Sequence, residues 1–61
     1  MNKHELVDAL QKLALDTKEI VVALDKHYPE SGKAQELAGA AHIMLDWADN
    51  ISDEIEHDNK G

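Results

Sequence analysis

Residues 31–57 read SGKAQELAGAAHIMLDWADNISDEIEH, and the spacing of their apolar side chains decides the fold of this chain. The main apolar strip of this segment recurs at steps of three and four, which places it on one face of an α-helix. A second apolar strip, formed by Ala40, Ile43 and Trp47, lies beside the main strip. Because one partner helix cannot cover both strips, we expect this helix to be packed from two sides. The main strip consists of Ala34, Leu37, Ala41, Met44, Ala48, Ile51 and Ile55.

The residues before this segment predict another helix of similar length. Its apolar positions alternate steps of four and three, a repeat typical of helices that pack at a shallow crossing angle. Val7, Ala14, Val21 and Tyr28 recur at steps of seven beside this stripe and widen it. The stripe itself consists of Leu6, Leu10, Leu13, Thr17, Ile20, Leu24 and His27.

Capping and turn residues set the ends of the two predicted helices. Asn2 is a suitable N-cap for the first helix, and Ser31 for the second. Pro29 disfavours helical geometry at the residue before it and so ends the first helix. The short connection makes the two helices antiparallel neighbours. The chain is therefore predicted to be one domain, residues 1–61, with helix 3–28, turn 29–32, helix 33–56 and a frayed tail 57–61.

The size of the chain predicts self-association. It has 61 residues and no cysteine, which excludes disulfides and thiolate metal sites. Domains of this size bury only part of their unfolded surface, and association is the means of stabilisation left to this one. We expect an all-α fold, an antiparallel helical hairpin that dimerises into a four-helix bundle. The predicted dimer core consists of Leu6, Leu10, Leu13, Ile20, Leu24, Leu37, Ala41, Met44, Ala48, Ile51 and Ile55.

The charge balance restricts the kind of partner. The formal net charge is −7, while 43% of the residues are hydrophobic, which is too apolar for a disordered acidic tail. An acidic surface repels phosphates, so we expect no direct contact with nucleic acid or with anionic membranes. No apolar run approaches the ~20 residues of a membrane span, and the N-terminus lacks a signal-peptide pattern. These features predict a soluble cytoplasmic protein, and they permit a protein partner with a basic surface.

Acidic residues gather near the end of the second predicted helix. Carboxylates at a helix C-terminus oppose the helix dipole, which suggests a use other than stability. They can dock onto a basic protein, imitate the phosphates of DNA, or simply keep the bundle soluble. Trp47 either belongs to the core or dimer interface, or anchors a partner. The predicted partner surface consists of Asp46, Asp49, Asp53, Glu54, Glu56 and Trp47, with Asp58 extending the acidic cluster.

Two apolar residues of the first helix, Leu15 and Val22, lie seven apart and outside its stripe. They are either scattered surface residues, which are common, or part of a second contact surface.

No residue pattern indicates catalysis or a cofactor. Glu54 and His57 have the Glu-x-x-His spacing of carboxylate-bridged di-iron bundles, but those sites also need inward-facing glutamates from other helices. The stripe of the first helix offers none. Thr17, Ser31 and Ser52 lack the setting of a nucleophile, and the chain has no glycine-rich phosphate loop. We therefore expect no catalytic residue, no cofactor and no metal.

Three segments carry a family resemblance. Residues 1–6 (MNKHEL), 37–41 (LAGAA) and 48–55 (ADNISDEI) look similar to small proteins of lambdoid phages and prophages. Those proteins are encoded in the accessory early region between the recombination and excision genes. The resemblance implies an intracellular phage protein that takes part in the choice between lysis and lysogeny by contacting host or phage proteins. The leading hypothesis is thus a non-enzymatic homodimer acting by protein–protein contact. The alternative is an acidic DNA mimic that inhibits a nucleic-acid-binding protein.

Overall fold

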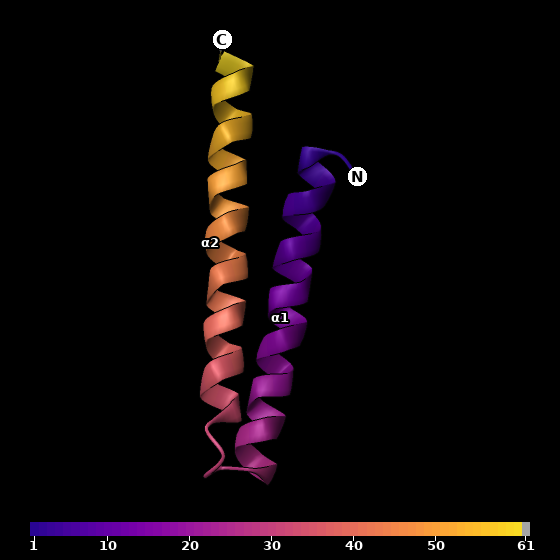
Figure 1. Ribbon diagram of the computed structural model, residues 1–61. Helices are drawn as coiled ribbons and strands as arrows, with labels where there is room; N and C mark the ends of the chain where they lie inside the picture. The colour runs from indigo at the N-terminus through magenta and orange to yellow at the C-terminus, as the bar shows by residue number, and fades with distance from the viewer. Residues whose placement is uncertain (61) are drawn as a thin grey trace.

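Two antiparallel α-helices form a hairpin in the computed structural model, which describes residues 1–60, with side chains for residues 1–58 (Figure 1). Helix α1 runs over Lys3–His27 and helix α2 over Lys33–Lys60. The described part of the chain measures 50 × 15 × 12 Å and contains no strand. The all-α hairpin predicted from the sequence is confirmed.

Helix α1 begins and ends at local signals. The Asn2 side-chain carbonyl accepts a hydrogen bond from the Glu5 amide at 2.8 Å, as expected of an N-cap. At the other end the Tyr28 amide donates to the Leu24 carbonyl, but Tyr28 itself has left the helical conformation. The helix therefore ends one residue before the predicted boundary, because Pro29 restricts the backbone of the residue before it.

The turn is held by Ser31 and Gly32. The Ser31 hydroxyl donates to the Tyr28 carbonyl at 2.9 Å and accepts from the Lys33 amide at 3.2 Å, so it contacts the ends of both helices. Gly32 has a φ of 76°, in the left-handed region that favours glycine. These two residues reverse the chain within the predicted turn.

Small side chains dominate the contact between the two helices. We call the residues of each helix that face the other helix the seam. The buried residues are Ala14, Ala41, Ala48 and Thr17. The Thr17 hydroxyl donates to the Leu13 carbonyl one turn back at 2.7 Å, so no buried side-chain nitrogen or oxygen is left without a partner in the described residues. On α2 the seam is the predicted main strip, whose seven members are all buried or half-buried.

On α1 the seam differs from the predicted stripe. It follows Val7, Leu10, Ala14, Thr17, Val21 and Leu24, all buried or half-buried. Leu6, Leu13 and Ile20 of the predicted stripe are 39%, 54% and 53% exposed, and His27 is exposed as well. The physical reason is size, because a seam built on Ala14 lets the helices approach more closely than one built on Leu13.

Helix α2 is longer than predicted. It continues to Lys60, four residues past the expected end at Glu56. Residues 57–60 of the predicted tail are therefore helical, and residue 61 lies outside the described residues. In Figure 1 the last turns of α2 project beyond the start of α1.

Candidate interaction surfaces

Exposed apolar side chains of the two helices share one side of the hairpin. Leu6, Leu13 and Ile20 each stand one position before a seam residue of α1, and Ala40 and Trp47 stand one position before seam residues of α2. Two facing antiparallel helices are related by an approximate two-fold axis perpendicular to the plane that contains both helix axes. This rotation exchanges the helices but keeps each side of the plane in place. Residues that directly precede a seam residue, on either helix, therefore lie on the same side of the hairpin. Ile43 is one turn from Trp47 and extends this surface. We call it the apolar face, and it consists of the exposed Leu6, Leu13, Ile20, Ile43 and Trp47 together with the half-buried Ala40.

The opposite side of the hairpin confirms this geometry. Near the turn it has an open hollow of about 410 Å³. Among its lining residues, Val22 and Asp25 of α1 and Gln35 and Ala38 of α2 each stand one position after a seam residue. Residues that come directly after a seam residue in the sequence thus lie on one side of the hairpin, and residues that come directly before a seam residue lie on the other.

Leu15 and Val22 lie on the side of the hollow. They are 62% and 69% exposed, and Val22 lines the hollow itself. Neither belongs to the apolar face, so the hairpin exposes apolar side chains on two sides. A role for this pair as a second contact surface stays a prediction.

Four of the predicted partner residues form a single row along α2. Asp46, Asp49, Asp53 and Glu56 follow one another at steps of three, four and three, all exposed, and we call them the acidic row. The His42 Nε2 lies 3.7 Å from an Asp46 carboxylate oxygen on the exposed surface. Within residues 1–58 no lysine forms an ion pair with the row. As far as side chains are described, through residue 58, its carboxylates therefore face solvent without a lysine counter-charge.

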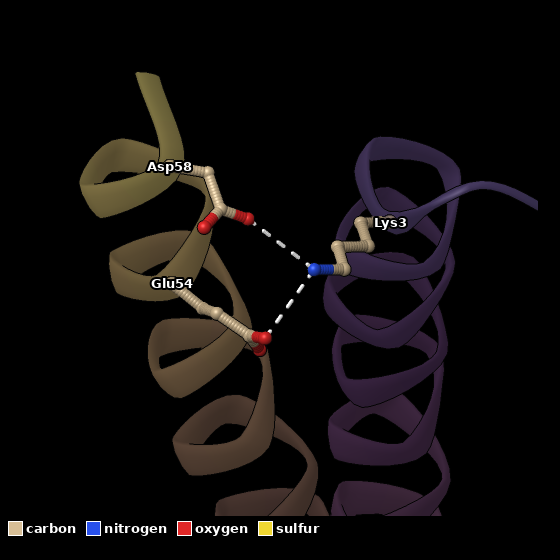
Figure 2. A network of polar contacts seen from close by, with 3 residues as sticks. All are labelled: Lys3, Glu54 and Asp58. Carbon is tan, nitrogen blue, oxygen red and sulfur yellow. Dashed lines mark hydrogen bonds and ion pairs between the residues drawn. The ribbon is translucent and has the colours of Figure 1, made fainter. Parts of the chain in front are cut away.

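Glu54 and Asp58 belong to a different environment. The Lys3 ammonium of α1 lies 3.3 Å from a Glu54 carboxylate oxygen and 3.4 Å from one of Asp58, as Figure 2 shows. Hydrogen bonds to Glu54 and then to Asp58 raise the pKa of Lys3 above its ordinary value. All three side chains are largely exposed, so the two ion pairs contribute little to the stability of the fold. The predicted acidic cluster is thus divided between an outward row and a cross-helix contact that the sequence did not reveal.

The described part of the chain offers no candidate metal site and no candidate membrane span. No group of three or more histidine, aspartate or glutamate side chains there is placed to hold a metal ion. Glu54 of the Glu-x-x-His pattern instead contacts Lys3. Neither helix, as far as it is described, is long and apolar enough to cross a bilayer.

Comparison with known proteins leaves the chain without an assigned relative. No family model matches it, and no curated protein or solved structure is significantly similar to it. The resemblance of residues 1–6, 37–41 and 48–55 to lambdoid phage proteins is untouched by this result and stays an expectation. The apolar face and the acidic row are the two surfaces from which a role can be argued.

Proposed function

We propose that this protein is a homodimer in which two hairpins bury their apolar faces against each other as a four-helix bundle. The observation that carries this proposal is the core of the single hairpin, which within residues 1–58 buries three alanines and one threonine but fully buries no large side chain. A domain held by so little apolar burial is marginal on its own. A second copy supplies the missing cover for Leu13 and Trp47.

The exposed area supports the same proposal. The hairpin exposes 4849 Å², whereas a folded monomer of 6.8 kDa typically exposes about 4,000 Å². The excess is close to the ~800 Å² that each partner contributes to an interface of standard size. Burying the apolar face would bring the exposed area of each copy into the ordinary range.

The dimer acts by protein–protein contact and not by catalysis. Its working surface is the acidic row, Asp46, Asp49, Asp53 and Glu56, which docks onto a basic surface of another protein. Support comes from the outward position of the row and from the lack of a lysine partner within residues 1–58. Trp47 lies on the apolar face, so we assign it to the dimer interface and not to the partner surface.

The biological setting is proposed from the family resemblance alone. Residues 1–6, 37–41 and 48–55 favour a phage or prophage accessory protein in the cytoplasm of a bacterial host. There the protein would influence the choice between lysis and lysogeny by contacting a host or phage protein.

One observation favours a second candidate function. The acidic row is a straight line of exposed carboxylates along a helix, an arrangement that can imitate a row of DNA phosphates. A DNA mimic would inhibit a DNA-binding protein. Its complex would weaken steeply with salt, because nearly all of its attraction would be electrostatic.

Affinity capture from a bacterial lysate tests the proposed working surface. The test variant neutralises the row with Asp46→Asn, Asp49→Asn, Asp53→Asn and Glu56→Gln. The matched control removes the same four charges elsewhere, with Asp16→Asn, Glu19→Gln, Glu30→Gln and Glu36→Gln. We expect wild type and control to retain a partner that the test variant loses. If all three chains retain the same proteins, the acidic row is not the working surface.

A further inference from the structure

The two hairpins of the proposed dimer can pack their apolar faces in two ways. In a parallel dimer both turns lie at one end, and α1 of each copy faces α2 of the other. In an antiparallel dimer the turns lie at opposite ends, and α1 faces α1 of the second copy. We infer that the dimer is antiparallel. This inference rests on the proposed function, because it names how the second copy occupies the apolar face.

The register of the hairpin supplies the first argument. Lys3 contacts Glu54 and Asp58, so Leu6 lies at the level of Glu54, and Leu13 lies near that of Trp47. Glu54 stands one position before the seam residue Ile55, and so it borders the side of the apolar face. In a parallel dimer Leu6 would pack against the Glu54 carboxylate of the second copy, which is unfavourable for both groups.

The antiparallel arrangement moves the Glu54 carboxylate away from Leu6 and places it near Ala40 of the second copy, a smaller side chain that is already half-buried within its own hairpin. The α1 part of the apolar face consists of Leu6, Leu13 and Ile20. These residues are spaced evenly at seven residues, so this strip of α1 is symmetric about Leu13. A two-fold axis passing near Leu13 places Leu6 of one copy against Ile20 of the other, and Leu13 near its own counterpart. Every apolar residue of this strip then meets an apolar residue.

Charge supplies the second, independent argument. The open half of the hairpin, residues 1–15 and 46–61, holds eight acidic residues and three lysines, a balance of −5. The turn half, residues 16–45, holds five acidic residues and three lysines, a balance of −2. A parallel dimer gathers −10 at one end. An antiparallel dimer places the open half of one copy, with a charge of −5, beside the turn half of the other, with a charge of −2. Each end of the dimer then carries −7, which lowers the repulsion between the copies.

The arrangement has a consequence for the acidic rows. Each row ends near the open end of its own hairpin, and the two open ends lie at opposite ends of the antiparallel bundle. The dimer therefore presents two separate acidic surfaces that run in opposite directions. A partner protein can engage one of them without blocking the other.

Spin-label distances test the inference, because a chain without cysteine can be labelled at one introduced site. Glu30→Cys places the label in the exposed turn, and Asp16→Cys places a control label near mid-length. For the antiparallel dimer we expect a Glu30→Cys label separation of about 45 Å, given a rise of 1.5 Å per residue. A parallel dimer gives about 25 Å or less, since neighbouring helices in a bundle lie 8–10 Å apart. The Asp16→Cys labels are expected to be close in either arrangement.

The outcomes separate this inference from the dimer itself. Close Asp16→Cys labels together with distant Glu30→Cys labels support the antiparallel arrangement. If both pairs of labels are close, the dimer stands and the orientation is parallel, which overturns the inference. If neither pair shows a dipolar coupling and sedimentation gives a monomer, the proposed dimer itself is wrong.

Discussion

At the residue scale, two glycines give a matched test of how the hairpin reverses direction. Gly32 has a φ of 76°, while an added Cβ would meet nothing within 4 Å at Gly32 or at Gly39. Gly32→Ala should therefore destabilise the protein by about 1–2 kcal/mol, through backbone strain alone. Gly39→Ala should stabilise it by about 0.5–1 kcal/mol, because Gly39 lies within α2. Urea denaturation measures both, and a loss of stability in both variants would contradict this account of the turn.

Lys3 gives a second prediction at this scale, with a defined pH dependence. Contacts with Glu54 and Asp58 raise the pKa of Lys3 above its ordinary value of 10.5. A raised pKa means that the stabilisation is complete below pH 10.5 and is lost as the pH rises through the higher folded-state value. Lys3→Met should therefore speed amide exchange at the open end at neutral pH and low salt. In ~1 M salt, where charges are screened within ~3 Å, wild type and variant should exchange alike. A difference that persists in high salt would show that packing, and not charge, holds this end.

At the element scale, the two exposed leucines of α1 test which side meets the second copy. Leu13 belongs to the apolar face, whereas Leu15, two residues later, lies on the side of the hollow. Leu13→Glu should weaken dimerisation by at least about 100-fold, because each dimer loses two buried leucines worth about 1.5–3 kcal/mol apiece. Leu15→Glu should leave the dimer unchanged. Sedimentation velocity compares the two, and equal effects would remove the apolar face as the interface.

The elements also show what the sequence could predict and what it could not. Local sequence patterns were enough to predict both helices, the Asn2 cap and the Ser31 contact with the second helix. Each of these features depends on residues only a few positions apart in the sequence. The seam of α1 did not follow from its own sequence. Leu13 and Ala14 both fit a repeat of three and four, and the choice depends on how closely α2 can approach.

The candidate sites divide in the same way. The sequence predicts an acidic cluster that contains the four residues of the row, because these acids lie close together on one helix. It does not separate them from Glu54 and Asp58. The contact of Lys3 with Glu54 spans 51 residues and depends on the register of the hairpin, which only the folded chain fixes. The end of α2 at Lys60 was also missed, because its last turn holds polar residues that give no apolar period.

At the scale of the whole molecule, the hairpin fully buries no large side chain among residues 1–58. In the proposed dimer the chain would fold together with its second copy, so its stability should depend on concentration. Sedimentation equilibrium at micromolar concentration, combined with thermal melting of the same samples, tests this most directly. We predict a species of twice the 6.8 kDa chain mass whose melting temperature rises with concentration. A compact 6.8 kDa species that melts cooperatively at a temperature independent of concentration would contradict the account.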